Sequence, residues 1–261
     1  MLSGLNSITV SSRQGVYETI KRTSDFIISL LLLLFLSPLL LIIGLVIRFT
    51  SSGPVLYRQK RVGRRNRIFH VYKFRTMVES ADQLGPLITA SDDTRVTRIG
   101  RFLRNHKIDE FPQLINVIKG DMSLVGPRPQ VLRFVDKFPP DKRDIILSVR
   151  PGMTGPTQMR FRHEEQILEG MENREIYYIQ QILPEKCSMD VEYVRNHSII
   201  NDLHLVVQTS LLVLGSVFSP LSSLSKHVPE PYAVVNENPF SGGFTEMISS
   251  EEKVLTSVHD E

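Results

Sequence analysis

The sequence of 261 residues contains a single cysteine, Cys187, so a disulfide within the chain is impossible. This excludes a small domain held together by disulfides and fits a reducing compartment. Cys187 stands in Pro-Glu-Lys-Cys-Ser with no catalytic motif around it, and we expect no chemical role for it. The seven histidines are scattered without the spacing of metal ligands, which argues against a structural zinc site.

Two common phosphate-binding motifs are also missing. The sequence has no glycine-rich loop of the Walker type, and no G-x-G-x-x-G motif follows a strand, so P-loop and dinucleotide-binding folds lack support. No internal repeat is visible. Apolar residues make up 41% and charged residues 23% of the chain, which indicates a folded protein but no particular chemistry.

Acidic residues are unevenly distributed along the chain. Residues 221–261 carry two Lys/Arg and seven Asp/Glu, a charge of −5. Since the whole chain has a net charge of +3, the first 220 residues carry +8. A basic body suggests an anionic partner such as nucleic acid, a phosphate substrate or a lipid surface, or simply a solvated basic face. Residues 221–261 are rich in Ser, Glu and Pro without a sustained period, which predicts a flexible tail.

One long apolar run covers residues 26–47, which as a straight helix would reach about 33 Å, enough to cross a bilayer core. Ser37-Pro38 lies in its middle, and proline breaks or bends a helix. Both flanks are basic, and basic flanks favour the cytoplasm. A helix–break–helix hairpin that enters and leaves on one side satisfies both observations, but kinked spanning helices are common, so both topologies stay open at this point.

Beyond this run, the pattern predicts a β-hairpin and several helices. Strands are expected over residues 55–62 and 68–77, because both stretches are rich in β-branched and aromatic residues around a polar turn. Helices are expected over 94–104, 109–119, 140–148, 163–182 and part of 187–218. Residues 203–218 are apolar but interrupted by polar side chains, which suggests an interfacial or buried helix and not a spanning one.

Asp109 and Glu110 begin one of these helices and follow several basic residues. An acid pair at this position is explained by helix capping alone. The alternative is a phosphate site, because Lys73 and Arg75 share one face of a strand and two arginines stand beside prolines, Arg128 and Arg150. Fixed arginines with a carboxylate pair suit Mg²⁺-dependent chemistry on a diphosphate.

The 21 residues 109–129, DEFPQLINVIKGDMSLVGPRP, closely resemble the core signature of the bacterial sugar transferase family, the monotopic phosphoglycosyl transferases. Other parts of the resemblance follow in order and cover roughly residues 20–215: Lys21-Arg22, Ser37-Pro38, Gly53-Pro54-Val55, KFRTM at 73–77, TRIGRFLR at 97–104 and RPGMTG at 150–155. The chain departs from the family pattern at Pro156-Thr157-Gln158, where a small apolar pair is usual, at Asp202, and in its acidic tail.

This resemblance implies a fold and a reaction. It implies a mostly helical α/β single domain on the membrane, with a re-entrant hairpin broken at Ser37 and Pro38 and a short β-hairpin. Asp109 would be the nucleophile and Mg²⁺ ligand, and Glu110 its partner. The carboxylate would attack the β-phosphate of a UDP-sugar, release UMP and pass the phosphosugar to polyprenyl (undecaprenyl) phosphate. Lys73, Arg75, Arg128 and Arg150 would bind substrate phosphates.

The expected organisation has four parts: an N-terminal segment at 1–25, the membrane hairpin at 26–47, a catalytic domain at 48–220 and the tail at 221–261. The catalytic domain is expected on the cytoplasmic face of the bacterial inner membrane. The expected partners are a UDP-sugar, polyprenyl phosphate and membrane lipid, with downstream glycosyl transferases of a surface glycan pathway possible and nucleic acid excluded. Two alternatives remain: a membrane-anchored lipid-binding scaffold, and a glycosyl transferase that releases UDP.

Overall fold

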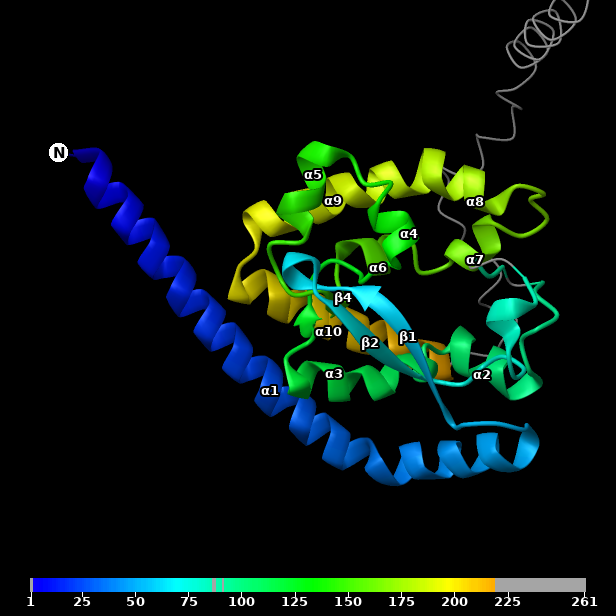
Figure 1. Ribbon diagram of the computed structural model, residues 1–261. Coiled ribbons are helices and arrows are strands. Elements are labelled where there is room, and N and C mark those ends of the chain that lie inside the picture. The colour runs from blue at the N-terminus through cyan, green and yellow to red at the C-terminus, as the bar shows by residue number, and fades with distance from the viewer. Residues whose placement is uncertain (1, 86–87, 91, 219–261) are drawn as a thin grey trace, which may run out of the picture. The chain divides into compact units, whose positions relative to one another are not determined.

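The structure, a computed structural model, describes residues 2–85, 88–90 and 92–218, and the predicted tail lies outside them. The described chain is mostly helical, as predicted, and contains two small sheets (Figure 1). It begins with α1 (Leu2–Thr50), and the part Gly15–Thr50 is the one segment of the described residues long and apolar enough to cross a membrane. On α1, Phe35 and Phe49 are 81% and 83% exposed. Large apolar side chains in such numbers on a surface suit lipid better than water.

Helix α1 continues through Ser37-Pro38 and changes direction partway along its length (Figure 1). Proline has no backbone N–H, so the carbonyl of Leu34, one turn earlier, loses its usual donor. The hydroxyl of Ser37 donates to that carbonyl at 2.8 Å instead. Ser37 therefore satisfies the acceptor that Pro38 leaves, and the chain bends here without a complete break in the helix.

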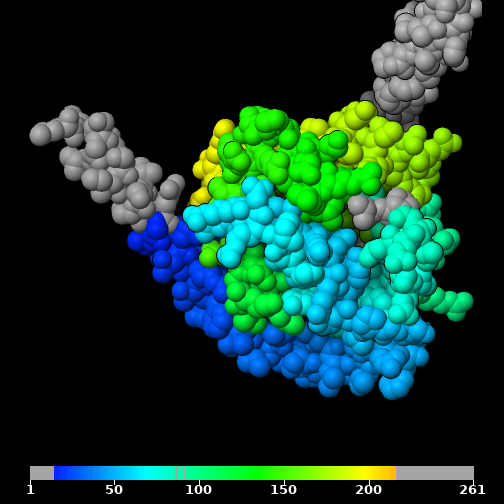
Figure 2. All heavy atoms as spheres, viewed as in Figure 1, coloured from blue at the N-terminus to red at the C-terminus, as the bar shows by residue number. Residues whose placement is uncertain are grey.

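Two side chains early in α1 attach it to the body of the protein. The guanidinium of Arg22 donates to the carbonyls of Val117 at 2.6 Å and Ile118 at 2.8 Å, at the end of α3 (Leu114–Lys119). Asp25 accepts from the Ser123 hydroxyl at 2.6 Å, on strand β3 (Ser123–Val125). Figure 2 shows α1 along one margin of the body, beside these elements.

The β-hairpin forms where it was predicted. Strand β1 (Leu56–Val62) pairs antiparallel with β2 (Ile68–Phe74), so the second strand ends three residues earlier than expected. The turn η1 (Arg64–Asn66) contains two residues in the left-handed region, Arg65 and Asn66. The register places Lys73 opposite Tyr57. Because side chains alternate along a strand, Lys73 shares its face with Tyr57 and Gln59.

The remaining helical elements cover the hairpin and follow one another closely. Their bounds are η2 Ala81–Gln83, α2 Arg98–Asn105, η3 Ile108–Gln113, α4 Leu132–Val135, α5 Pro140–Ile146, α6 Pro156–Arg160, α7 Glu164–Ile167, α8 Arg174–Tyr177, η4 Tyr178–Ile182, α9 Leu183–Asn196 and α10 Ile199–Phe218. The helix predicted over 163–182 is wrong as one element, since Gly170 adopts a left-handed φ of 72° and separates α7 from α8. On α10, Ile200 and Leu203 are 80% and 60% exposed, so this helix is not buried.

A parallel strand pair, β3 with β4 (Gly152–Thr154), was not predicted from the sequence. The two strands meet at glycines: a Cβ added to Gly152 would lie 2.1 Å from the backbone nitrogen of Gly126. No side chain fits at that distance. Gly126 and Gly152 therefore allow the two backbones to approach each other two residues before Arg128. The sequence alone did not show that these two glycines meet.

Strand β2 lies between two hydrophobic clusters. Phe69 and Val71 pack with Leu114 and Val117 of α3 in the first cluster. Phe74 packs with Ile47, Leu103 and Ile108 in the second cluster. Both clusters include partly buried residues of α1. The strand that carries Lys73 is thus held on both faces, and the second cluster joins it to the end of α1.

The fully buried side chain of Asn116 joins α3 to β2. Its Oδ1 accepts from the backbone N–H of Tyr72 at 3.0 Å, and its Nδ2 donates to the carbonyl of His70 at 2.7 Å. The amide thus satisfies two backbone groups of β2 that a neighbouring strand would otherwise pair with. This contact fixes the position of β2, and with it Lys73, relative to η3 and α3.

We expect Asn116→Ala to lower the free energy of unfolding by about 2–4 kcal/mol, because two backbone groups lose their partners and a cavity forms. Thermal unfolding in detergent measures this loss. Asn201→Ala is the matched control, since Asn201 is exposed and its amide reaches one carbonyl at 3.3 Å. A loss for Asn116→Ala no larger than that of the control would contradict the role assigned to Asn116.

Candidate active site

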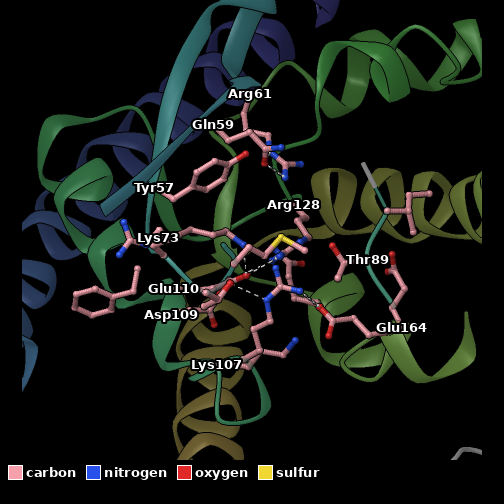
Figure 3. Close-up of a pocket in the computed structure, with 18 of the residues that line it drawn as sticks. Tyr57, Gln59, Arg61, Lys73, Thr89, Lys107, Asp109, Glu110, Arg128 and Glu164 are labelled. Atoms are coloured by element: carbon pink, nitrogen blue, oxygen red, sulfur yellow. Dashed lines mark hydrogen bonds and ion pairs between the residues drawn. The ribbon is translucent and has the colours of Figure 1, made fainter. Parts of the chain in front are cut away.

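A cavity of about 980 Å³ lies between the β-hairpin, η3, and the segments 153–165 and 178–186. Its wall is rich in cations and contains two adjacent carboxylates, Asp109 and Glu110. Figure 3 shows Lys73, Asp109, Glu110 and Arg128 converging on this space from different elements. Lys73 and Arg128 thus lie 55 positions apart in the sequence, yet both line the same cavity.

The carboxylates enter the cavity because of a turn before η3. Lys107 adopts a left-handed conformation with φ 57°, which redirects the chain after α2. Asp109 and Glu110 then occupy the first turn of η3, a 3-10 helix that leads into α3. The predicted helix over 109–119 is thus two elements, and the acid pair lies in the tighter one.

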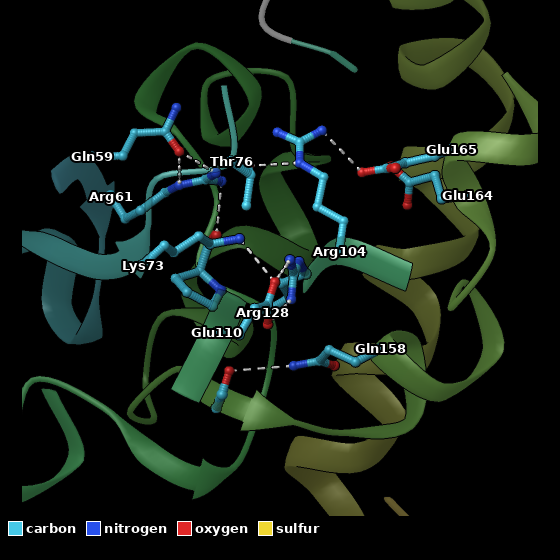
Figure 4. Close-up of polar contacts among 12 residues, drawn as sticks. Gln59, Arg61, Lys73, Thr76, Arg104, Glu110, Arg128, Gln158, Glu164 and Glu165 are labelled. Atoms are coloured by element: carbon cyan, nitrogen blue, oxygen red, sulfur yellow. Dashed lines mark hydrogen bonds and ion pairs between the residues drawn. The ribbon is translucent and has the colours of Figure 1, made fainter. Parts of the chain in front are cut away.

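Glu110 is held by two cations. Its Oε1 lies 2.8 Å from the Lys73 ammonium and 2.7 Å from Nη2 of Arg128. Nη1 of Arg128 donates to the other carboxylate oxygen at 3.3 Å, so the arginine binds in a bidentate manner. The three groups come from β2, η3 and the segment after β3, and Glu110 therefore fixes both cations at the cavity wall (Figure 4).

The two neighbouring carboxylates have opposite electrostatic environments. Burial disfavours the ionised form of Glu110, but the charges of Arg128 and Lys73 outweigh it and hold the pKa of Glu110 well below its usual range. Burial raises the pKa of Asp109, and the charge of Glu110 adds to this effect, although Lys73 opposes it. Burial also lowers the pKa of Lys73. The surroundings thus favour the ionised form of Glu110 and the protonated form of Asp109.

Asp109 has an oxygen that the protein does not satisfy. Its Oδ1 is buried and has no hydrogen-bond partner among the described residues. No cluster of three or more His, Cys, Asp or Glu that could hold a metal occurs in the part of the chain that the structure describes. Mg²⁺ is usually held by one or two carboxylates together with substrate phosphates, and the unpaired oxygen of Asp109 fits this kind of site.

The structure brings only part of the predicted phosphate-binding set together. Lys73 and Arg128 lie at Glu110, as described. Arg75 also lines the cavity, but its Nη2 donates to the carbonyl and hydroxyl oxygens of Ser51, at 2.8 and 2.7 Å. Arg150 lies outside the cavity that the described residues enclose, where it contacts the carbonyl of Gly120 and the carboxylate of Glu18. Arg150 is therefore not among the described residues that line this cavity, and its phosphate contact stays a prediction.

Other cations in the wall were missed by the sequence analysis: Arg61, Arg104 and Lys107. Arg61 donates to Gln59 and to the carbonyl of Pro129, and burial together with the nearby Arg128 lowers its pKa to about 10. Arg104 donates to the Thr76 hydroxyl at 2.8 Å (Figure 4). The alternation of β1 could have placed Arg61, since it shares a face with Tyr57, which lies opposite Lys73.

The cavity wall opposite the β-hairpin is polar and aromatic. Lys186 of α9 forms an ion pair with Glu164 of α7 and lies 5.1 Å from the ring centre of Phe161 and 5.0 Å from that of Tyr178. Burial lowers the pKa of Lys186, while Glu164 opposes this effect. The Lys186 charge is thus stabilised by one carboxylate and two aromatic faces.

Comparisons with known proteins agree with this geometry. Residues 16–216 match the family model described as bacterial sugar transferase. Over 149 residues, the chain is 43% identical to a UDP-N-acetylgalactosamine-undecaprenyl-phosphate N-acetylgalactosaminephosphotransferase of Aeromonas hydrophila, covering 55% of the chain and 34% of that protein. It is 36% identical over 202 residues to a UDP-glucose:undecaprenyl-phosphate glucose-1-phosphate transferase of Klebsiella pneumoniae, covering 76% of the chain and 41% of that protein.

A protein of Caulobacter vibrioides with the same name as the Klebsiella relative is 37% identical over 204 residues. The alignment covers 76% of the chain and 72% of the Caulobacter protein. The chain thus spans less than half the length of the Aeromonas and Klebsiella proteins but most of the Caulobacter one.

The opposite pKa shifts predict opposite effects on stability. The contribution of Asp109, whose folded pKa is raised, is lost as pH rises through that pKa, so Asp109→Asn should gain stability relative to wild type between pH 5 and 8. The contribution of Glu110, whose folded pKa is lowered, is present above its unfolded pKa of about 4.3. Glu110→Gln should therefore lose about 2 kcal/mol throughout this range, because it leaves Lys73 and Arg128 unpaired.

Thermal unfolding of both variants at pH 5, 6, 7 and 8 measures these trends. Each variant is the control for the other, since both replace an acid of η3 by its amide. Parallel curves for the two variants would show that Asp109 and Glu110 do not differ in their environments.

Proposed function

Because the chain belongs to the bacterial sugar transferase family, we propose that it transfers a sugar 1-phosphate from a UDP-sugar to polyprenyl phosphate and releases UMP. The observation that carries this proposal is the unpaired, buried oxygen of Asp109 beside two cations fixed by Glu110. The relatives named above act on undecaprenyl phosphate, which supports the acceptor class. Their donors, by name, are UDP-sugars.

The proposed reaction has two displacements at one phosphorus atom. A carboxylate oxygen of Asp109 forms a bond to the β-phosphorus of the donor, and the bond from that phosphorus to the bridging oxygen breaks. UMP leaves with the bridging oxygen and its electron pair. An oxygen of polyprenyl phosphate then attacks the same phosphorus, and the carboxylate of Asp109 leaves unchanged. The covalent step replaces one difficult transfer with two easier ones.

The cations of the wall would make attack by a carboxylate feasible. Lys73 and Arg128, held by Glu110, are proposed to contact the phosphates, and Arg75 has Nε and Nη1 without partners in the described chain. These groups would neutralise the diphosphate and hold it in line with Asp109. The unpaired oxygen of Asp109 would hold Mg²⁺ together with substrate phosphates, and such an ion supplies further neutralisation of phosphate charge.

We infer further that α1 is a re-entrant hairpin in the inner membrane and that the body lies on the cytoplasmic face. Arg22 and Asp25, before the apolar run, bind α3 and β3, whereas Ile47, at its end, packs into the core with Phe74. One folded body lies on one side of a membrane, so it cannot contact both ends of a helix that spans the bilayer. This argument and the bend in α1 support the hairpin, and the basic flanks support the cytoplasmic side.

The nucleophile is tested by Asp109→Asn, which keeps the shape of the side chain but removes the attacking carboxylate. Turnover should fall by about three orders of magnitude or more, because a covalent step is lost. Incubation of wild-type protein with a UDP-sugar and no lipid should release at most about one UMP per active site and leave the phosphosugar on Asp109, which mass spectrometry would locate.

Asp121→Asn is the control, since Asp121 belongs to the same 109–129 segment but does not line the cavity that the described residues enclose. Full turnover by Asp109→Asn would refute the assignment. Release of UDP would identify a glycosyl transferase, and lipid binding without nucleotide release would identify a scaffold.

The topology is tested by single cysteines at the two ends of α1. Ser11→Cys and Ser52→Cys, each in a Cys187→Ser background, should both react with a thiol reagent supplied from the cytoplasmic side. Replacement of Pro38 by Leu should move part of the molecules to a spanning form, because a straight helix of this length can cross the bilayer core. Labelling of Ser11→Cys from the outside alone would rule out the hairpin.

A further inference from the structure

A series of buried polar side chains lies in the cavity wall at Thr157 and Gln158. The hydroxyl of Thr157 has two partners. Its Oγ1 lies 2.8 Å from Oε1 of Gln158 and 3.0 Å from Oδ1 of Asp190, on α9. Thr157 is 1% exposed and Asp190 5% exposed, so both side chains are buried.

The orientation of the Gln158 amide follows from its backbone partners. Nε2 lies 3.1 Å from the carbonyl oxygen of Gly126 and 3.3 Å from that of Gly152 (Figure 4). Both partners are acceptors, so the nitrogen side of the amide must face them. The oxygen side, Oε1, therefore faces Thr157 and requires a donor there.

The hydrogen-bonded series Asp190–Thr157–Gln158 lacks one proton if Asp190 is ionised. The Thr157 hydroxyl carries a single proton, and Oε1 of Gln158 requires it. An ionised Asp190 is also only an acceptor, so one of the contacts at 2.8 and 3.0 Å would join two oxygens without a proton. A neutral Asp190 resolves this, because its own proton is donated to Oγ1 of Thr157.

We propose that Asp190 is a positioning residue that carries a buried proton, donates it to Thr157, and thereby holds Gln158 against the backbone that presents Arg128. Asp190, Thr157 and Gln158 form a directed series of four hydrogen bonds, of which the last two end on the carbonyls of Gly126 and Gly152. These carbonyls belong to the close approach of β3 and β4, two residues before Arg128. This series thus connects a residue outside the cavity to the bidentate contact of Arg128 with Glu110.

The surroundings of Asp190 agree with the proton. Burial raises its pKa to about 7, although contact with Thr157 and the charge of Lys186 lower it. Lys186 and Cys187, on its own helix α9, interact electrostatically with Asp190. From the elements packed against α9, Arg160 of α6 is paired with Glu185, and Lys142 of α5 donates to Ser188. The described residues place no carboxylate–ammonium ion pair on Asp190 itself, and Lys186 is instead paired with Glu164.

Ionisation of Asp190 would reverse the direction of its hydrogen bond with Thr157. The carboxylate can only accept, so it would draw the Thr157 proton towards itself. Oε1 of Gln158 would then face the lone pairs of Thr157, and its amide would move away from Gly126 and Gly152. We therefore expect Arg128 to be held less well above pH 7 than below it.

The proton is tested first by stability, which is independent of any activity. The folded pKa of Asp190 is raised, so its contribution to stability is full below the unfolded pKa and is lost as pH rises through the folded one. The unfolding temperature of wild type relative to Asp190→Asn should therefore fall from pH 5 to pH 7 and level off at pH 8. Asp93→Asn is the control, because contact with Arg95 lowers the pKa of Asp93 and its difference from wild type should stay constant.

The positioning role is tested by the pH profile of kcat/KM, and this test rests on the proposed function. For wild type and Thr157→Ser, kcat/KM should fall above about pH 7. In Asp190→Asn the amide still donates to Thr157, so the alkaline fall of kcat/KM should begin at least one pH unit higher. Thr157→Val should reduce kcat/KM by about tenfold at all pH values, because Gln158 loses its donor.

The outcomes separate the two proposals. A constant stability difference between wild type and Asp190→Asn from pH 5 to 8 would overturn the buried proton. A normal stability trend with an unchanged alkaline limb in Asp190→Asn would overturn the positioning role. Absence of UMP release by wild type would refute the proposed function while leaving the stability result in place.

Discussion

The site depends on the way in which Glu110 divides its charge between Lys73 and Arg128. Two cations this close would repel each other in a partly buried wall, and the shared carboxylate allows them to face the same cavity. Because Glu110 is fully engaged, its neighbour Asp109 is left with an unsatisfied oxygen. The two acids thus have different surroundings, although they are adjacent in sequence. The β-hairpin, α3 and the paired strands β3 and β4 together hold Glu110 in contact with Lys73 and Arg128.

Much of this arrangement could be predicted from the sequence, because local patterns determine it. The β-hairpin follows from β-branched residues around a polar turn, and the bend in α1 follows from Pro38. The acid pair at Asp109 was found as a candidate because of the basic residues around it, although helix capping explained it equally well. Lys73 and Arg128 were selected for a strand face and for rigid prolines, and both line the cavity beside Glu110.

Other features depend on contacts between distant segments, which no local pattern contains. Arg128 and Arg150 stand in similar Pro-flanked motifs, yet the first meets Glu110 and the second meets Glu18 and Gly120. The pairing of β3 with β4 needs only three residues from each strand and two glycines, too few for a periodic signal. The partner of Thr157, Asp190, lies 33 residues away on another helix. Only the folded structure shows that these two side chains are in contact.

The attachment of α1 at both ends has a consequence for the way in which the protein would meet its substrates. On the proposed topology, Arg22, Asp25 and Ile47 set a constant height of the cavity above the bilayer. A lipid acceptor then reaches the cavity by diffusion within a plane, whereas a soluble donor arrives from the volume of the cytoplasm. The two encounter rates therefore scale with different quantities, the number of acceptor molecules per unit area of membrane and the bulk concentration of the nucleotide sugar. Dilution of the membrane with inert lipid would slow the second displacement and leave the first unaffected.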